Sequence, residues 1–284
     1  MKIIRSPQEM RSIASKIKRN GKKIGLVPTM GALHEGHLSL IKRALKENNI
    51  VVVSIFVNPK QFGPKEDYIL YPRPFKKDIK VCEKIGADYV FSPKPIAMYP
   101  KSHLTFVNVE KLSEVLCGKS RPGHFRGVAT IVAKLFNIIQ PDKAYFGMKD
   151  YQQLKIIEQM AKDLDFPVKI VSCPIIREKS GLALSSRNQY LSISQHNDSP
   201  MIYQSLQSAR DLIKSKKAKN AEKITKILKK NLLKIPDSKI DYISILNAKN
   251  MGPLNLIKPP IVIAVAVWVG KTRLIDNIVI EKYS

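Results

Sequence analysis

His34 and His37, two histidines three positions apart, are the residues of this sequence best suited to chemistry. An apolar run at residues 24–27 precedes them and an amphipathic stretch at 38–45 follows, so the order predicts a strand, a turn and a helix. The first residues of a helix present unpaired N–H groups and a partial positive charge, which attract phosphate. Two imidazoles at this place add donors that can follow charge developing on a phosphate. The segment therefore predicts nucleotidyl transfer from a nucleoside triphosphate.

The histidine pair by itself is also compatible with helix capping, with a fragment of a zinc site or with chance. Gly31 and Gly36 favour the nucleotide interpretation, because a backbone without Cβ atoms can approach a ligand closely. The rest of the chain has to decide between these alternatives.

The composition is typical of a protein with a buried core, in one large domain or two smaller ones. The chain has 284 residues, of which 44% are hydrophobic, and its longest apolar run, 261–269, is strand-sized rather than membrane-spanning. The N-terminus has no signal-peptide pattern. Cys82, Cys117 and Cys173 are few, odd in number and scattered, which argues against a disulfide framework or a zinc site. We therefore expect a cytoplasmic protein with no metal site of its own.

The formal net charge of +26 is the one anomaly of the composition. A basic excess can indicate nucleic-acid binding or an anionic substrate. The lysines are spread along the chain, densest at 210–234, and no aromatic pattern for stacking bases accompanies them. We favour a solvated, lysine-rich surface whose positive field attracts anionic substrates, and we expect no nucleic-acid partner.

The first part of the chain alternates between strand-like and helix-like segments. Strands are predicted at 24–27, 50–57, 89–91, 144–146 and 168–171, and helices at 38–46, 75–85, 128–139 and 151–164. Ser6 and Pro7 predict the start of a further helix near the N-terminus. This alternation predicts an α/β fold with a Rossmann-like, doubly wound parallel sheet, which binds ligands beyond the carboxyl ends of its strands.

The pattern changes after about residue 175. Two helices are predicted at 195–215 and 221–232, followed by strands at 240–246, 261–269 and 274–281. We expect a Rossmann-like domain at 1–175 and a smaller C-terminal α+β lid domain at 176–284 with an antiparallel sheet. A site at their junction could open and close as the small domain swings.

Four further segments follow the histidine pair in order, at 58–63, 118–127, 146–154 and 181–188. They read Asn-Pro-Lys-Gln-Phe-Gly, Gly-Lys-Ser-Arg-Pro-Gly-His-Phe-Arg-Gly, Phe-Gly-Met-Lys-Asp-Tyr-Gln-Gln-Leu and Gly-Leu-Ala-Leu-Ser-Ser-Arg-Asn. With His-Glu-Gly-His they closely resemble the pantoate–β-alanine ligase (pantothenate synthetase) family, from about Ile3 to the end of the chain. That family belongs to the nucleotidyltransferase superfamily that shares a fold core and the His-x-Gly-His signature with class I aminoacyl-tRNA synthetases.

The resemblance implies a two-step reaction in pantothenate (vitamin B5) and coenzyme A precursor biosynthesis. The (R)-pantoate carboxylate attacks the α-phosphate of ATP, giving pantoyl adenylate and pyrophosphate. The β-alanine amine then attacks the activated carbonyl, giving pantothenate and AMP. The resemblance also implies Mg²⁺ accompanying ATP, held mainly by phosphate oxygens and water, and a homodimer.

The same resemblance assigns the site residues. His37 is implied as proton donor, although a purely charge-stabilising role fits equally well, and Gln61 and Gln153 as the pantoate-binding pair, with Gln61 also near β-alanine. The implied catalytic residues are His34, His37, Lys149, Ser185, Ser186 and Arg187. The implied ATP-binding residues are Met30, Gly31, Ala32, Leu33, His34, Glu35, Gly36, His37, Gly147, Met148, Lys149, Asp150, Ile176, Leu184, Ser185, Ser186 and Arg187.

Asn58, Tyr71 and Arg121 are weaker candidates. Two positions depart from the family pattern: Met148 stands where an acidic residue is frequent, and Pro74 where a small polar residue is common. Neither is assigned to chemistry, so they affect the expected loop geometry rather than the expected activity.

Two other functions compete with this interpretation. A different nucleotidyltransferase would move AMP or CMP onto a phosphate-bearing acceptor, and it would not need Gln61 and Gln153 in these settings. An RNA-binding protein that retains the fold without activity has only the +26 charge in its favour, and its affinity should fall steeply with salt.

Overall fold

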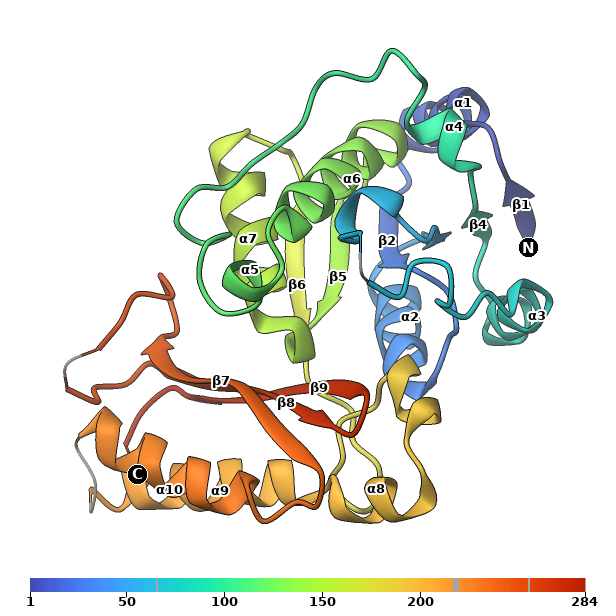
Figure 1. Cartoon of the computed structure of the whole chain (residues 1–284). Helices are drawn as coiled ribbons and strands as arrows, with labels where there is room; N and C mark the ends of the chain where they lie inside the picture. Colours follow the sequence, from blue (N-terminus) through green and yellow to red (C-terminus); the bar gives the residue numbers. More distant parts are fainter. Residues whose placement is uncertain (65, 217–219, 255, 284) are drawn as a thin grey trace. The chain divides into compact units, whose positions relative to one another are not determined.

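The computed structural model describes residues 1–64, 66–216, 220–254 and 256–283. It contains two compact units (Figure 1). The first comprises Met1–Met148 and Gln153–Pro174, and the second comprises Lys149–Gln152 and Ile175–Ser284. Part of the lysine-rich stretch, residues 217–219, lies outside the described residues. The functional division at residue 175 stays a prediction.

The first unit is built on a six-stranded, fully parallel sheet in the order β1-β4-β3-β2-β5-β6. The strands are β1 (Lys2–Ile4), β2 (Ile24–Thr29), β3 (Ile50–Ile55), β4 (Tyr89–Phe91), β5 (Lys143–Gly147) and β6 (Lys169–Cys173). Central strands such as β3 are almost entirely buried, as expected where helices cover both faces of a sheet. This confirms the predicted doubly wound fold, with β1 as an additional edge strand that the sequence did not predict.

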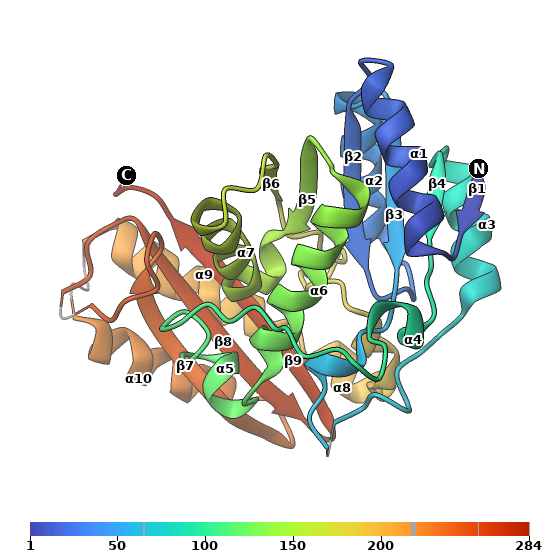
Figure 2. The ribbon, with the colours of Figure 1, turned by 90° about the horizontal axis from the view of Figure 1, so that it is seen from above.

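Helices lie on both faces of this sheet. The helices of this part of the chain are α1 (Pro7–Arg19), α2 (Glu35–Glu47), α3 (Phe75–Ile85), α4 (Pro95–Met98), α5 (Cys117–Ser120), α6 (His124–Ile139) and α7 (Tyr151–Asp163). Helices α2 and α3 share a buried apolar cluster with β3, whereas α1 packs beside α6 (Figure 2). Ser6 caps α1 as predicted, accepting the N–H of Glu9 at 3.3 Å, with Pro7 as the first helical residue.

The second unit has an antiparallel sheet of three strands, β7 (Ser238–Asn247), β8 (Ile261–Val269) and β9 (Thr272–Ile280). Helices α9 (Met201–Lys214) and α10 (Ala221–Leu232) bury an apolar cluster against it. The single helix predicted at 195–215 is wrong, because the chain forms α8 (Ile193–Asp198) and then α9. Pro200 lies at the break, where its missing N–H cannot continue the first helix.

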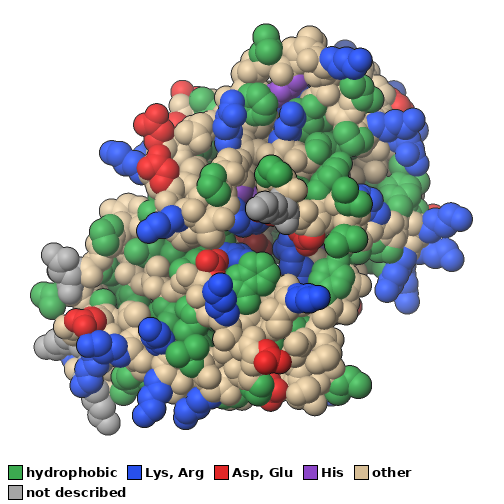
Figure 3. Space-filling model, viewed as in Figure 1, with side chains coloured by type: hydrophobic (Ala, Val, Ile, Leu, Met, Phe, Trp, Pro, Cys, Tyr) green, Lys and Arg blue, Asp and Glu red, His purple; other side chains and the backbone are tan. Residues whose placement is uncertain are grey.

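No helix in the described part of the chain is both long enough and apolar enough to span a bilayer. The three cysteines are buried and form no disulfide. Lys and Arg side chains are dispersed over the face drawn in Figure 3 rather than gathered in one patch.

The last residue of α2 ties that helix to β5. Glu47 accepts hydrogen bonds from Arg43 Nε, Lys143 Nζ and the Tyr145 hydroxyl, each at 3.0 Å. The Arg43 hydrogen bond, followed by that of Lys143, lowers the pKa of Glu47 from its usual value of 4.5 to about 2. A carboxylate whose pKa falls on folding stabilises the fold above its unfolded pKa, and this stabilisation is lost as the pH falls through its folded pKa.

Glu47→Gln is therefore expected to lower the melting temperature at pH 7 by about 2–4 °C, a small value because solvent screens this half-exposed group. The difference from the unchanged protein should shrink below about pH 4.5 and vanish near pH 2, the window set by the two pKa values. Thermal melts across pH 2–7 measure this. Glu222→Gln, at an exposed ion pair with Lys226 on α10, is the control and should shift the melting temperature far less. A constant difference at every pH would contradict the linkage.

Candidate functional site

The turn between β2 and α2 carries the first group of predicted nucleotide-binding residues. Thr29, the last residue of β2, donates to the Ser54 carbonyl (2.7 Å) and accepts the Gly31 N–H (3.1 Å) through the same hydroxyl. Gly31 and Ala32 have positive φ angles of 83° and 50°. A Cβ on Gly31 would lie 2.9 Å from a carboxylate oxygen of Asp78, so only glycine fits this turn without displacing that side chain.

Asp78 contacts this turn from another helix, a role that the sequence did not predict. It lies in the first part of α3 with only 1% of its surface exposed, and it accepts the N–H groups of Ala32 and Leu33, both at 2.9 Å. Burial raises the pKa of this carboxyl, and the two N–H groups oppose that rise. An acidic residue in the first turn of an amphipathic helix is the only sequence signal, and it is also what an ordinary helix start looks like.

The two histidines pack together at the start of α2. Their ring centroids are 4.1 Å apart. His34 is the N-cap, and its Nδ1 accepts the Gly36 N–H at 3.1 Å, while His37 Nδ1 accepts the His34 N–H at 3.4 Å. An Nδ1 that accepts leaves the proton of a neutral ring on Nε2. The two rings therefore present Nε2–H groups beside the helix N-terminus, a suitable arrangement for phosphate oxygens.

Gln61 lies next to this turn in the same unit. It ends a short helix, η1 (Pro59–Gln61), with 8% of its surface exposed, and its Nε2 donates to the sulfur of Met30 at 3.1 Å. Asn58 is buried behind it: its Nδ2 donates to Gln61 Oε1 (3.1 Å) and to the Gly127 carbonyl (3.0 Å). Its Oδ1 accepts the Tyr99 hydroxyl (2.9 Å). The geometry therefore gives Asn58 the task of orienting Gln61.

His124, Arg121 and Glu66 form a series of polar contacts that begins at the backbone of η1. His124 Nδ1 lies 2.8 Å from the Gln61 carbonyl, and His124 Nε2 lies 3.2 Å from Arg121. Because a carbonyl only accepts and a guanidinium only donates, neutral His124 carries its proton on Nδ1. Arg121 also forms a two-point ion pair with Glu66, with Nε at 2.8 Å from Oε1. The Arg121 ion pair lowers the pKa of Glu66 although burial opposes this shift most strongly. Arg121 thus connects the loop that carries Glu66 with the start of α6.

The other predicted residues of the first unit occupy the ends of strands and helices. Gly147 ends β5, Met148 begins η2 (Met148–Asp150), and half-buried Gln153 lies in α7. Tyr71 is buried, with its ring in edge contact with Phe62 at 5.9 Å between centroids.

Lys149 and Asp150 belong to the second unit. Lys149 is half-buried and its carbonyl accepts a hydrogen bond from Asn277 Nδ2 at 2.9 Å, whereas Asp150 is exposed. The next residue, Tyr151, donates its hydroxyl to the Ala248 carbonyl at 2.8 Å. These contacts fix the backbone of the Lys149 segment to the small sheet unit.

The loop at 176–188 brings the remaining predicted residues of this unit together. Leu184 N–H donates to the Ile176 carbonyl (3.0 Å), and Ser185 begins η3 (Ser186–Tyr190) by accepting the Arg187 N–H (3.3 Å). Arg177, which the sequence did not predict, anchors the loop through two hydrogen bonds to buried Asp276 (2.6 and 2.9 Å). No local sequence signal connects two residues that are 99 positions apart.

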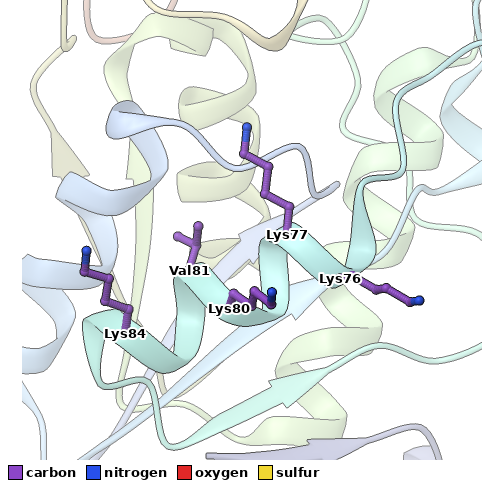
Figure 4. A pocket seen from close by; sticks show the side chains of 5 residues that line it. All are labelled: Lys76, Lys77, Lys80, Val81 and Lys84. Atoms are coloured by element: carbon purple, nitrogen blue, oxygen red, sulfur yellow. The ribbon is translucent and has the colours of Figure 1, made fainter.

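A shallow depression of about 390 Å³ lies on the outer face of α3, lined by Lys76, Lys77, Lys80, Val81 and Lys84 (Figure 4). Its lysines extend in different directions and bring no nucleophile or acid–base pair together. In the described ranges, no group of three or more His, Cys, Asp or Glu side chains is arranged to hold a metal ion.

Comparison with known proteins gives a consistent result across the whole chain. The family model described as "Pantoate-beta-alanine ligase" matches residues 2–279. Pantothenate synthetases from Caldicellulosiruptor saccharolyticus and Endomicrobium trichonymphae are 52% and 53% identical, over 99% of this chain and 100% and 99% of theirs. The crystal structure of pantothenate synthetase from Thermus thermophilus has a TM-score of 0.92 at 42% identity, covering 98% of this chain and 99% of that one. The Francisella tularensis pantoate–β-alanine ligase, complexed with "Beta-gamma ATP" and β-alanine, has a TM-score of 0.81 at 38% identity, covering 98% and 97%.

Proposed function

Because this chain belongs to the pantoate–β-alanine ligase family, it is an ATP-dependent ligase that forms pantothenate, and we propose that the residues described above carry out its two steps. A carboxylate is a poor electrophile, since hydroxide would have to leave. Transfer of AMP onto pantoate supplies a good leaving group, and the amine of β-alanine then displaces AMP. The first step requires charge stabilisation on the phosphates of ATP, and the second requires a bound acyl adenylate.

The observation that carries the proposal is the pair of imidazoles at the start of α2. Both rings accept backbone N–H groups through Nδ1, so each neutral ring carries its proton on Nε2 and donates from there to phosphoryl oxygens as negative charge develops. The residues from Met30 to His37 line the nucleotide in this proposal, with Gly31 and Gly36 allowing close approach of the backbone. His37 donates a proton or only a hydrogen bond, and both roles use the same Nε2.

Gln61 and Gln153 are proposed to bind pantoate, since an amide can donate to its carboxylate and accept from its hydroxyls. The hydrogen bonds from Asn58 to Gln61 and from Gln61 to Met30 support this role for Gln61, because they fix the amide beside the nucleotide turn. Gln61 is also proposed to lie near β-alanine.

The second unit supplies the other charged groups of the proposal. Lys149 places a positive charge on the phosphates, and Ser185, Ser186 and Arg187 offer hydroxyl and guanidinium donors to the same anion. Asp150 is proposed to bind a ribose hydroxyl or to cap the following helix, two compatible roles. Gly147, Met148, Ile176 and Leu184 are proposed to contact the nucleotide through backbone and apolar groups.

Mg²⁺ is proposed to arrive with ATP and to neutralise phosphate charge. Phosphate oxygens and water hold such an ion well, which suits a site whose nearby donors are imidazole and amide groups. We also propose a cytoplasmic location and a homodimer. Sedimentation of the purified protein at micromolar concentration tests the dimer, and a single monomeric species would refute it.

The function is tested by following pyrophosphate release from ATP and Mg²⁺ with pantoate alone, and then AMP and pantothenate after adding β-alanine. We expect pantoate-dependent release. Lys149→Ala is expected to slow it about 100-fold, because a fixed charge on the phosphates is lost. Lys155→Ala, at an ion pair with Glu158 on α7, is the matched control and should retain the rate. Folded protein that releases no pyrophosphate with pantoate would refute the ligase function and direct attention to other acceptors.

A further inference from the structure

A buried carboxylate holds the turn that precedes the histidine pair. The two oxygens of Asp78 are divided between consecutive backbone groups, with Oδ2 accepting from Ala32 and Oδ1 from Leu33. The aspartate lies 46 residues further along the chain, on a different helix, so this contact is not part of the local turn geometry. With only 1% of its surface exposed, Asp78 is not a solvent-facing acid.

The turn needs an external constraint of this kind. Gly31 and Ala32 both lie in the left-handed region of backbone space, and alanine adopts that region reluctantly because of its Cβ. Hydrogen bonds from N–H groups to a carboxylate are stronger than those to a neutral acceptor. Two of them, on successive residues, keep the backbone in this conformation.

Hydrogen bonds on three successive backbone N–H groups connect Asp78 to the imidazole of His37. Asp78 fixes the N–H groups of residues 32 and 33, and the next N–H in the chain, that of His34, donates to His37 Nδ1 at 3.4 Å. The direction of the His34 N–H therefore contributes to the rotation of the His37 ring, and with it to the position of Nε2. A shift of the turn moves this donor relative to the phosphates.

We propose that Asp78 is a positioning residue for adenylate formation: its carboxylate, through the backbone of Ala32 and Leu33, aims His37 Nε2 at the phosphates of ATP. The inference rests on the proposed function of the histidine pair. Asp78 itself touches neither substrate nor reacting atoms in this proposal. Its effect on the rate is exerted chiefly through the position of His37.

The chain offers a matched control for loss of a carboxylate that binds backbone. Asp88 Oδ2 accepts the Val51 N–H at 2.8 Å near the amino end of β3, away from the carboxyl ends where the turn lies. Asp88→Asn therefore removes the same kind of hydrogen bond from the same unit without touching the nucleotide turn.

The test is a double-mutant cycle read by pantoate-dependent pyrophosphate release. Asp78→Asn keeps the size of the side chain, but its amide can accept only one of the two N–H groups and its NH₂ opposes the other. We expect the rate to fall at least about tenfold in the otherwise unchanged protein, as small misplacements of catalytic groups commonly do. In a His37→Ala background the same change should alter the rate less than about threefold, because the group it positions is absent.

Several results would overturn the inference. Equal losses from Asp78→Asn in both backgrounds would show a general structural role, and an unchanged rate would show no role. A similar loss of rate from Asp88→Asn would show that any such hydrogen bond matters. If Asp78→Asn does not fold, Gly31→Ala replaces it, since its Cβ would meet the carboxylate at 2.9 Å; it is expected to give the same non-additive pattern. Failure of the unchanged protein to release pyrophosphate would refute the proposed function instead.

Discussion

His37→Ala is expected to slow pantoate-dependent pyrophosphate release by about 100- to 1000-fold, the usual loss for one donor to a developing oxyanion. The reason is the orientation of the ring, whose Nδ1 accepts the His34 N–H, so the proton of the neutral ring lies on Nε2, the nitrogen that donates to phosphate in this proposal. The measurement is the single-turnover rate of pyrophosphate formation at saturating ATP and pantoate. Single-turnover conditions isolate the chemical step from product release.

Two further variants separate the phosphate contact from the helix cap. His37→Asn places an acceptor near the position of Nδ1 and so retains the bond to His34, but has nothing at the position of Nε2. His37→Gln can place an amide N–H near Nε2 but loses the cap contact. We expect Asn to restore thermal stability without activity and Gln to restore part of the activity. Recovery of the rate by Asn alone would contradict the role of Nε2.

Gly127→Ala is expected to raise the KM for pantoate at least tenfold, because it displaces the segment that carries Gln61. Gly127 lies in α6 directly against η1, and a Cβ there would be 2.2 Å from the Lys60 carbonyl oxygen and 2.6 Å from the Gln61 nitrogen. Both are backbone atoms, so no side-chain rotation relieves the clash, and η1 has to move. Overpacking of this kind costs about 1–3 kcal/mol in stability, so steady-state kinetics should be measured on protein verified as folded.

Gly25→Ala provides the comparison. It is the same substitution in the same unit, and its Cβ would meet the Asn48 side-chain nitrogen at 2.6 Å, near the amino end of β2. It should lower the melting temperature while leaving the pantoate KM within about twofold, since it does not contact η1. A normal pantoate KM in folded Gly127→Ala protein would show that η1 does not position the substrate.

The strand–turn–helix unit that carries the histidines was predictable because all its signals are local. An apolar run, two glycines and an amphipathic stretch lie within about 25 residues, and the structure has β2, a turn with φ of 83° at Gly31, and α2 in that order. Pairing of β2 with β3 follows from the short crossover between them. The family motifs extended the prediction to residues whose local sequence is not informative, such as Gln61.

The contacts that orient the site residues were not predictable in the same way. Asp78 and Ala32 are 46 residues apart, Arg121 and Glu66 are 55 apart, and Arg177 and Asp276 are 99 apart. The sequence around a charged residue on a helix or loop does not identify the distant residue that it will contact in the folded protein. The edge strand β1 was missed for a related reason, since three residues give too short a pattern.

The order of strands in the first unit has a consequence for the order in which the protein folds. Strand β2 pairs on one side with β3 and on the other with β5. Paired residues of β2 and β3 are 26 positions apart in the sequence, whereas the contact beside the β2–β5 pairing joins residues 118 positions apart. Closing the longer loop lowers the entropy of the chain before the contacts between β2 and β5 can offset that loss. The pairing of β2 with β5 is therefore expected to form late in folding. A partly folded chain would then hold the histidine turn before Gly147 and the residues after it reach their places. Such an intermediate would have about half of the proposed nucleotide-binding residues, so we expect it not to consume ATP.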